Sequence, residues 1–597
     1  MRVADYIADR VYKEGVHDVF MVAGGGMMFL SDGIAMHPQM NYVCNHHEQA
    51  SAMAAVAYAK YTGKLGVVYV STGCGATNAI TALLHAWQDS TACLFISGQV
   101  KKKETIRNSD LNIRQIGTQE ADIISIVESI SKYSVMVNDP NEIGYHLEKA
   151  IHLAQTGRPG PVWLDIPMDV QSAQIEIDKL RKFIPKEIDK EYTENPSKSE
   201  IQKLTKMLSS AKRPVIIAGQ GVRLAGAIPE FMNFIDTYKI PVVVPFMGVT
   251  NIPTAHESYV GVIGIKGSRA GNLAVQNADL VISLGSRLSV TAIGYEYNLF
   301  AREAKKVVVD IDPVEHQKKT INIDLFINAD IKNFLREFSP VGVPAIDEWR
   351  KTCLSLRKKY PACLPEYKKR KKGISFYYFV DTLTRKMKSD AVIVTDTGSA
   401  LYVTSQAMHV RKNQRHITSG GQAEMGFTLP GCIGISVARG GKEVLGISGD
   451  GSLQMNIQEL QTVVHHNLPV KLFVWNNNGY LSIKTTQNKF FDGRLIGSGP
   501  TSGVSLPDTK KIAAAYGIKY FKLANTSTLE KDMEEVLAYK GPVVCEVMCL
   551  EDDMVIPAAS SMRKEDGTMV SKPLEDMFPF LSREEFLSNM IVKPLEE

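Results

Sequence analysis

Apolar runs of strand length alternate with helix-length segments along most of this chain of 597 residues. Val67 to Ser71, Val162 to Ile166 and Leu280 to Leu284 are three such runs, each apolar at nearly every position. A strand that is apolar on both faces is expected in a parallel sheet covered by helices on each side. The alternation therefore predicts an α/β fold class built from doubly wound parallel sheets.

Two charged, proline-bearing stretches, residues 181–200 and 339–372, interrupt this pattern and have the composition of surface linkers. They predict three compact domains followed by a C-terminal tail. We place these parts at residues 1–180, 190–345, 370–560 and 561–597.

The first and last domains close on similar segments. Residues 160–167 read GPVWLDIP, and residues 541–547 read GPVVCEV. Each segment combines a turn with entry into a buried strand. This echo predicts that the two outer domains are related and that the middle domain differs from them.

Charge and cysteine content narrow the class of function. The chain has 68 Lys and Arg against 64 Asp and Glu, a net charge of +4, so it predicts no strong attraction to nucleic acid or to an anionic membrane. Its eight cysteines form no C-x-x-C pair, which argues against a zinc site or a disulfide framework and favours the reducing cytoplasm. No apolar run reaches the ~18–20 residues of a membrane span, and we expect no signal peptide.

A glycine turn marks the first candidate site. Gly449, Asp450, Gly451 and Ser452 follow an apolar run and precede a helical pattern. Such a turn presents backbone N–H groups and a helix N-terminus to an anion, and a phosphate is the natural guest. Taken alone, the G-D-G turn is a weak motif, because many such turns are only tight loops.

The next apolar run, Val470 to Trp475, ends in a second polar segment that contains Asn477 and Gly479. Consecutive strands of a parallel sheet end at the same edge, so Asp450 and Asn477 are expected to converge. Carboxylate and amide oxygens suit Mg²⁺, which commonly bridges to phosphate. The two segments together predict a metal and phosphate site.

The spacing between the G-D-G turn and Asn477 resembles the diphosphate-binding signature of thiamine-diphosphate enzymes. Three segments of the first domain resemble acetolactate synthase motifs in order and spacing: residues 45–50 (NHHEQA), 71–78 (STGCGATN) and 96–100 (ISGQV). The resemblance spans about residues 1–550. It implies a pyrimidine-binding domain, a central domain and a diphosphate-binding domain, in that order.

The resemblance assigns roles to particular residues. Asp450, Asn477 and the carbonyl of Gly479 would ligate Mg²⁺. Glu48 would be catalytic, because proton exchange between its carboxyl group and the cofactor pyrimidine ring activates the thiazolium carbon. Met425 would bend the cofactor so that its two rings approach each other.

Other positions would contact the cofactor along its length. The Ala423 carbonyl would face the pyrimidine amine, at a position where the family usually has glycine. The remaining expected contacts are Gly25, Gly73, Asn78, Gly398, Ser399, Ala400, Leu401, Gly449, Gly451, Ser452, Tyr480 and Leu481.

The match loosens around the acceptor substrate. Acetolactate synthases carry a phenylalanine beside a glutamine there, whereas this chain has Thr118 and Gln119. Gln119 is therefore a second catalytic candidate, and the acceptor stays open. Residues 479–487 look more like carboligases of surface-polysaccharide pathways, which favours a keto sugar nucleotide as one acceptor. Residues 287–291 replace the Arg-Phe-Asp-Asp-Arg stretch that helps to hold FAD in the family, so FAD stays open as well.

We predict an enzyme that decarboxylates a 2-keto acid, pyruvate in the first instance, and joins the two-carbon unit to an acceptor carbonyl. The alternatives on the same scaffold are a simple 2-keto-acid decarboxylase and a C–C bond hydrolase, and a non-catalytic nucleotide-binding regulator is a third. Family members place the glutamate domain of one subunit against the metal-binding domain of another. The resemblance therefore implies at least a homodimer, with dimer and tetramer both open.

Overall fold

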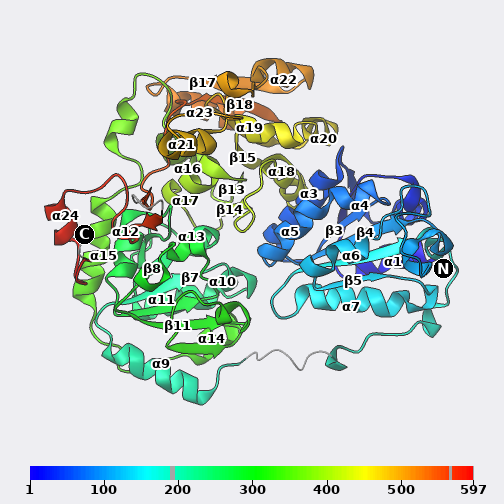
Figure 1. Cartoon of the computed structure of the whole chain (residues 1–597), viewed down its shortest axis with the longest axis horizontal. Helices are drawn as coiled ribbons and strands as arrows, with labels where there is room; N and C mark the ends of the chain where they lie inside the picture. Colours follow the sequence, from blue (N-terminus) through cyan, green and yellow to red (C-terminus); the bar gives the residue numbers. More distant parts are fainter. Residues whose placement is uncertain (188–194, 564–567, 596–597) are drawn as a thin grey trace.

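The computed structural model of the chain describes residues 1–187, 195–563 and 568–595. Within these ranges the strands form three six-stranded sheets and one two-stranded sheet. Every neighbouring pair in the three large sheets is parallel, for example β1 with β2, β10 with β11, and β15 with β16. Figure 1 shows the N-terminal domain on the right, the central domain at lower left and the C-terminal domain above them. The predicted fold class is confirmed.

The N-terminal domain has the strand order β2-β1-β3-β4-β6-β5. Its strands are β1 (Asp18–Met21), β2 (Asn41–Cys44), β3 (Gly66–Val70), β4 (Cys93–Gln99), β5 (Tyr133–Met136) and β6 (Pro161–Pro167). Its helices are α1 (Val3–Lys13), α2 (Met28–Met36), α3 (Glu48–Thr62), α4 (Cys74–Asn78), α5 (Ile80–Gln88), α6 (Ile123–Val127), α7 (Ile143–Gln155) and α8 (Met168–Gln171).

The C-terminal domain has the order β14-β13-β15-β16-β18-β17. Its strands are β13 (Val392–Thr395), β14 (Arg415–Thr418), β15 (Val444–Gly449), β16 (Val470–Asn476), β17 (Lys519–Leu523) and β18 (Val543–Met548). Its helices are α16 (Phe376–Lys386), α17 (Gly398–Ala407), α18 (Thr428–Ala438), α19 (Asp450–Leu453), α20 (Glu459–His465), α21 (Leu481–Phe490), α22 (Thr509–Ala515) and α23 (Leu529–Ala538).

The central domain has the order β12-β11-β10-β7-β8-β9. Its strands are β7 (Pro214–Ala218), β8 (Val242–Val244), β9 (Tyr259–Val262), β10 (Leu280–Leu284), β11 (Lys305–Asp310) and β12 (Leu325–Asn328). Its helices are α9 (Lys198–Ser210), α10 (Gly221–Leu224), α11 (Ile228–Tyr238), α12 (Arg269–Gln276), α13 (Val290–Ile293), α14 (Ile331–Glu337) and α15 (Asp347–Lys359).

The strand orders test whether the two outer domains, which close on similar segments, are built alike. When strands are numbered by appearance within each domain, both outer sheets read 2-1-3-4-6-5, and the central sheet reads 6-5-4-1-2-3. The two outer domains therefore share one topology and the central domain has another, as the echo between the outer domains predicted. The central order reverses between β7 and β10, which is the point where a doubly wound sheet offers a ligand crevice.

The N-terminal and C-terminal domains meet through helices α3 and α18. A Cβ on Gly434 of α18 would lie 2.1 Å from the carbonyl oxygen of Ala54 in α3, so the helices cross at close quarters only because position 434 is glycine. One hydrophobic core runs through both domains across this contact. The two sheets are therefore held as a unit within one chain.

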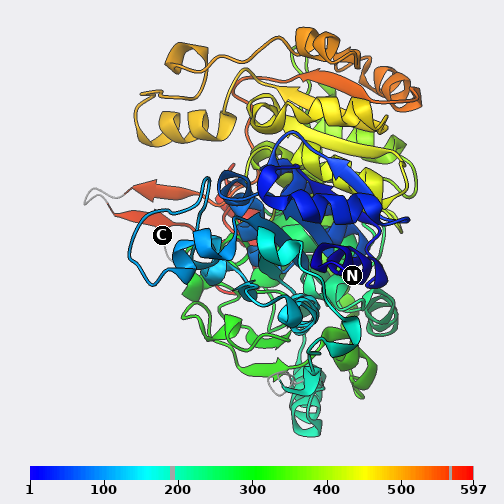
Figure 2. The ribbon, with the colours of Figure 1, turned by 90° about the vertical axis from the view of Figure 1, so that its right-hand side faces the viewer.

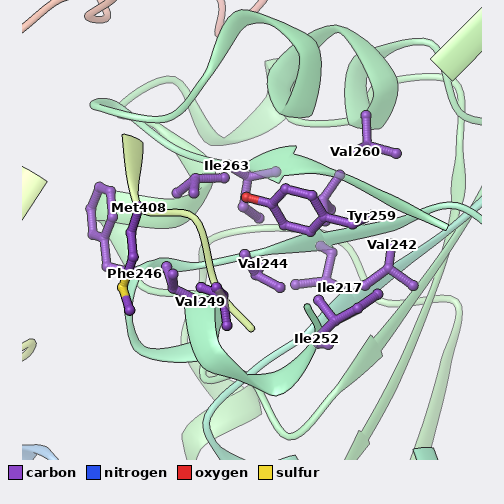
Figure 3. Close-up of a cluster of buried hydrophobic side chains, with 14 of the residues drawn as sticks. Ile217, Val242, Val244, Phe246, Val249, Ile252, Tyr259, Val260, Ile263 and Met408 are labelled. Atoms are coloured by element: carbon purple, nitrogen blue, oxygen red, sulfur yellow. The ribbon is translucent and has the colours of Figure 1, made fainter. Parts of the chain in front are cut away.

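The central and C-terminal domains also share a core. In Figure 3, Met408, which follows α17, lies beside Phe246 and Ile263 of the central domain. All three side chains are buried. Val242 and Val244 of β8 belong to the same core.

The segments outside the three sheets differ partly from expectation. Residues 339–372 contain α15, whose Trp349, Cys353 and Leu356 are buried, so this stretch is more than a surface linker. After residue 560 the chain forms β19 (Ser561–Arg563), β20 (Met569–Ser571) and α24 (Arg583–Ser588). The β19 and β20 hairpin projects from the molecule in Figure 2, whereas buried Leu574 and Met577 tie the later segment to the central domain. The predicted boundary at residue 190 lies outside the described residues.

None of the helices in the described ranges is long and apolar enough to cross a membrane.

Candidate functional site

The strands of the C-terminal sheet end at one edge, and the expected cofactor residues lie in the loops that follow them. Gly398 to Leu401 begin α17 after β13, and Ala423 and Met425 follow β14. Asp450 begins α19 after β15, and Asn477 follows β16. A Cβ on Gly398 would lie 3.4 Å from Ser482 Oγ, so the starts of α17 and α21 face each other. The structure therefore brings the sequence-predicted residues of this domain to one place.

Asp450 is a buried charged group at this edge. Its Oδ2 accepts hydrogen bonds from the backbone N–H groups of Asn477 at 3.1 Å and Gly479 at 3.3 Å, and its Oδ1 accepts one from Gly451 at 2.8 Å. Burial raises the pKa of Asp450 to about 6, although these backbone hydrogen bonds pull it down. No cationic side chain among the described residues pairs with this buried carboxylate, so the position favours a cation.

Three oxygen atoms converge beside Asp450. The side-chain oxygen of Asn477 lies 3.1 Å from Asp450 Oδ1 and 3.1 Å from the Gly479 carbonyl, and rotating the Asn477 amide would replace both approaches by hydrogen bonds. Acceptor oxygens this close repel one another unless a proton or a cation lies between them. A carboxylate, an amide and a carbonyl oxygen are a suitable partial set for Mg²⁺.

The neighbouring backbone can approach an anion. A Cβ on Gly449 would meet nothing within 4 Å, whereas one on Gly451 would lie 2.2 Å from the Tyr480 ring. A glycine is also required at position 479, where φ is +138° and a Cβ would lie 2.3 Å from the Ser498 carbonyl. Leu481 closes the segment as a buried side chain. The backbone of the turn is thus open at Gly449, whereas at Gly451 it packs against the Tyr480 ring.

Asp396 is a residue that the sequence reasoning missed. It follows β13, is fully buried, and accepts hydrogen bonds from Ser452 Oγ at 2.5 Å and Ser448 Oγ at 3.1 Å. It therefore holds the G-D-G turn from the adjacent strand end. The sequence contained a signal that could have identified Asp396, namely a polar residue directly after a buried strand. The same signal identified Asp450.

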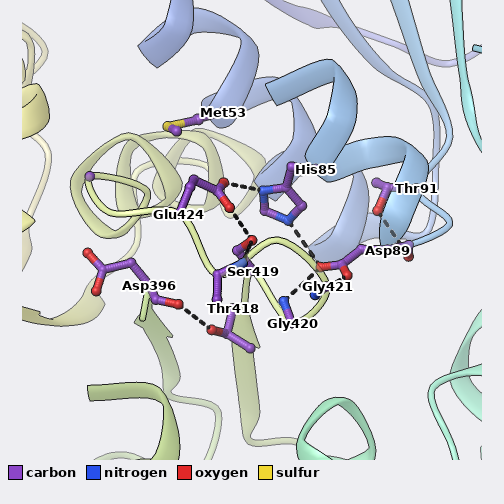
Figure 4. A network of polar contacts seen from close by, with 12 residues as sticks. Met53, His85, Asp89, Thr91, Asp396, Thr418, Ser419, Gly420, Gly421 and Glu424 are labelled. Atoms are coloured by element: carbon purple, nitrogen blue, oxygen red, sulfur yellow. Dashed lines mark hydrogen bonds and ion pairs between the residues drawn. The ribbon is translucent and has the colours of Figure 1, made fainter. Parts of the chain in front are cut away.

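The loop that carries Ala423 and Met425 is held by buried charges (Figure 4). Glu424 lies between these two residues, and its carboxylate contacts His85 Nδ1 of α5 at 2.6 Å and accepts a hydrogen bond from Ser419. Ala423 has φ of +53°, a conformation that costs a non-glycine residue about 1–2 kcal/mol. The family preference for glycine at this position has a direct structural reason.

A second carboxylate anchors the start of the same loop. Asp89 accepts hydrogen bonds from the backbone of Gly420 and Gly421 at 2.9 and 2.7 Å, and Lys60 Nζ lies 2.5 Å from its Oδ2. Burial and Lys60 oppose charge on His85, but Glu424 and Asp89 outweigh them, so the pKa of His85 is raised above 6.5. The N-terminal domain therefore positions a loop of the C-terminal domain by buried ion pairs.

We expect His85→Gln to destabilise the protein by about 3 kcal/mol at about pH 5.5, because it removes one partner of a buried ion pair. A raised folded-state pKa contributes stability below 6.5 that is lost as pH rises through the folded value. The gap in thermal melting midpoint between wild type and variant should therefore narrow as the pH rises through the folded-state pKa of His85. The exposed His465→Gln is the matched control, and a gap that stays constant with pH would contradict the assignment.

The N-terminal sheet gathers a second group of predicted residues. Glu48 begins α3 after β2, and its Oε2 accepts a hydrogen bond from Asn78 at 2.9 Å. Gly73 has φ of +58°, and a Cβ there would lie 1.8 Å from the backbone oxygen of Gln119. Gly25 lies in the loop after β1, with open space where a Cβ would be.

These two groups stay apart within the chain. Among the described residues, no hydrogen bond or ion pair joins Glu48 to Asp450, Asn477 or the loop of Met425. The polar contacts between the two domains come from other residues, such as His85 and Asp89 to the Met425 loop and Asn45 Nδ2 to Glu459 Oε2 at 2.8 Å. The candidate residues therefore fall into two groups, one in each outer domain, which we call half-sites.

A cavity of about 570 Å³ lies at the carboxyl edge of the central sheet. Gly221, Gly285 and Asp310 line it, as do Arg287 and Ser289 of the stretch that departs from the FAD-binding pattern. Arg158 of the N-terminal domain reaches across to Asp312 at 2.9 Å and Glu315 at 2.6 Å. The cavity occupies the place where this sheet order predicts a ligand.

Comparison with known protein families agrees with the three domains. Residues 1–126 match the N-terminal cofactor-binding domain of thiamine pyrophosphate enzymes. Thiamine pyrophosphate is another name for thiamine diphosphate. Residues 201–338 match the central domain of these enzymes, and residues 396–547 match their C-terminal binding domain.

Individual relatives are similar over almost their whole length. The acetolactate synthase large subunit of Lactococcus lactis is 33% identical over 91% of this chain and 92% of its own. Acetolactate synthase isozyme 1 large subunit of Escherichia coli is 31% identical over 93% and 95%, and the large subunit of Haemophilus influenzae is 31% identical over 96% and 99%. The chain therefore belongs to the thiamine pyrophosphate enzyme family that includes these acetolactate synthase large subunits.

Proposed function

We propose that this protein decarboxylates pyruvate with thiamine diphosphate and joins the two-carbon unit to an acceptor carbonyl. The observation that carries the proposal is the convergence of Asp450, Asn477 and Gly479 oxygens beside an open glycine turn. The names and coverage of the relatives support the reaction type. None of the three relatives described above is named as a simple decarboxylase or a hydrolase.

The C-terminal half-site would hold the diphosphate through a metal. Asp450, Asn477 and the Gly479 carbonyl would bind Mg²⁺, and the described residues contain no cluster of three His, Cys, Asp or Glu side chains to do so instead. No side chain caps the first turn of α17, so the N–H groups of Gly398 to Ala400 are free to face an anion, whereas Leu401 donates to the Thr397 carbonyl at 3.4 Å. Thiamine diphosphate, when bound, supplies a nucleophilic carbon and an electron sink for decarboxylation.

The N-terminal half-site would carry out the proton transfer that activates the cofactor. Asn78 fixes Oε2 of Glu48, so the orientation of the carboxyl group is set before any ligand arrives. A Cβ on Gly75 would lie 3.2 Å from Oε1, so glycine leaves this oxygen uncrowded. We assign to Glu48 the exchange of a proton with a ring nitrogen of the cofactor.

Gln119 is our candidate for orienting the acceptor. It is exposed, has φ of +64°, and sits directly over the Gly73 turn of the same half-site. An amide there can donate to a carbonyl oxygen or a hydroxyl group. This suits both a 2-keto acid and a keto sugar nucleotide, which are the acceptor classes that we propose.

A homo-oligomer, at least a dimer, would complete the site. Large apolar side chains are exposed next to both half-sites, including Leu111 at 62% in the Gln119 loop and Ile496 at 77% after the metal segment. Met455, 45% exposed, contacts the Gly426 turn beside Met425. Apolar surface of this kind favours burial against another subunit.

The proposed reaction is redox-neutral, because CO₂ leaves and a C–C bond forms without net electron transfer. It therefore needs no flavin, and FAD bound in the 570 Å³ cavity would have only a structural role. The free state of all eight cysteines agrees with the proposed cytoplasmic location.

Product analysis tests the proposal. Purified protein with Mg²⁺ and thiamine diphosphate would receive pyruvate alone, or pyruvate with 2-keto acids or keto sugar nucleotides, and mass spectrometry would identify the products. We expect an acceptor enlarged by two carbons, four hydrogens and one oxygen. Acetaldehyde alone with every acceptor would indicate a simple decarboxylase, and cleavage of a diketone by water would indicate a hydrolase.

A further inference from the structure

A second cavity, of about 480 Å³, lies where the three domains meet. Lys60 and Lys64 line it from the N-terminal domain, Arg223 from the central domain, and Arg415 and His416 from the C-terminal domain. Among the described residues that line it, none is Asp or Glu. The cavity adjoins the 570 Å³ cavity, with Gln220 and Met247 in both walls, but its charge is of one sign.

The two arginines of this cavity lack acidic partners. Within the described ranges neither Arg223 nor Arg415 takes part in an ion pair. Arg223 donates to the Thr250 carbonyl. Arg415 donates to the carbonyls of Lys60 at 2.9 Å and Tyr61 at 3.3 Å, at the C-terminus of α3, while its buried Nε has no acceptor.

Backbone carbonyls satisfy only part of these guanidinium groups. Burial, and then the charge of Arg415, lowers the pKa of Arg223 to about 9, and burial lowers that of Arg415 to about 10. Lys60 differs, because Asp89 neutralises it at 2.5 Å. Two partly buried cations that face one cavity without a counter-charge are unfavourable unless an anion joins them.

We propose that this cavity binds a phosphorylated small molecule, with its phosphoryl group between Arg223 and Arg415. Guanidinium groups match phosphate oxygens through paired, charge-assisted hydrogen bonds. The volume lies in the range of small-molecule sites, roughly 300–1,000 Å³, and exceeds the space that phosphate alone would fill. Ser90, Thr91 and Gln155 in the wall can hydrogen-bond to hydroxyl groups of a sugar.

This site goes beyond the proposed reaction, since none of its residues belongs to either half-site. Its ligand would link all three domains. Arg223 belongs to the central domain, and Arg415 belongs to the C-terminal domain and donates to the last carbonyls of α3 in the N-terminal domain. Arg415 begins β14, and β14 leads directly into the loop of Ala423 and Met425. A ligand bound between the arginines would therefore contact the strand that leads into that loop, a placement that suits a regulatory site.

Calorimetry and thermal melting on the enzyme saturated with thiamine diphosphate and Mg²⁺ test the proposal. The probes are ribose 5-phosphate, inorganic phosphate and ribose. We expect saturable binding of ribose 5-phosphate with a higher melting midpoint, weaker binding of inorganic phosphate, and none of ribose. Arg223→Gln and Arg415→Gln should each weaken ribose 5-phosphate binding by roughly tenfold or more, as a charged hydrogen bond contributes about 1.5–3 kcal/mol.

Arg439→Gln is the matched control. Arg439 also lies near Tyr61, but it pairs with Asp390 at 2.8 Å and does not line the cavity, so its loss should leave binding unchanged. Arg223→Lys keeps the charge and should keep part of the affinity, which separates loss of binding from loss of folding. The proposal is overturned by the absence of saturable ribose 5-phosphate binding, by equal binding of ribose, or by full affinity in both glutamine variants.

Discussion

Glu48→Gln is expected to lower turnover roughly 10²–10⁴-fold, the usual contribution of a general acid or base, while thiamine diphosphate still binds. Glutamine has nearly the same shape and can still pair with Asn78, but it cannot exchange a proton. The diphosphate end of the cofactor is held by the other half-site, so the affinity should change little. Steady-state kinetics and calorimetric titration of the cofactor give the two quantities.

The exposed Glu128→Gln, in the same domain, serves as the control for a lost charge. Near-normal turnover of Glu48→Gln would remove Glu48 from the mechanism. Loss of cofactor binding with unchanged melting would instead make it a binding residue.

Asp450→Asn is expected to weaken magnesium-dependent binding of thiamine diphosphate roughly a hundredfold or more, since loss of one partner from a buried charged contact costs about 2–5 kcal/mol. The asparagine keeps one oxygen for the N–H groups of Asn477 and Gly479 and loses only the acceptor for Gly451 N–H, so the turn should stay folded. Calorimetry with and without Mg²⁺ separates the metal-dependent part of the affinity.

Asp508→Asn, at an exposed helix cap, is the control for this substitution. Equal affinity of wild type and Asp450→Asn at saturating Mg²⁺ would show that Asp450 is not a metal ligand. A large fall in melting midpoint without ligand would assign Asp450 to the fold rather than to the metal.

Sequence reasoning predicted that Asp450 and Asn477 lie together because their positions depend on a simple rule of sheets. Asp450 and Asn477 each follow a buried strand, and the ends of neighbouring parallel strands meet. The echo between the outer domains was also readable, because a repeated strand order repeats its turn residues. Local pattern was sufficient in both cases.

Contacts between distant segments could not be predicted in this way. His85 and Glu424 are 339 positions apart, and neither lies in a motif that indicates the other. Arg223 and Arg415 come from different domains, so their shared cavity exists only after three domains pack. Helix α15 was missed because its basic composition, RKTCLSLRKK after Trp349, reads as a linker, while its buried face has only three apolar residues.

If two subunits share their reaction centres as proposed, the close crossing of α3 and α18 has a genetic consequence. It joins Glu48 and Asp450 to one rigid body, yet each would serve a different reaction centre, shared with a neighbouring subunit. A chain that has lost Glu48 still contributes a sound Asp450, and the reverse also holds. Two defective alleles of opposite kind would then complement each other, because a mixed dimer keeps one centre assembled entirely from undamaged halves.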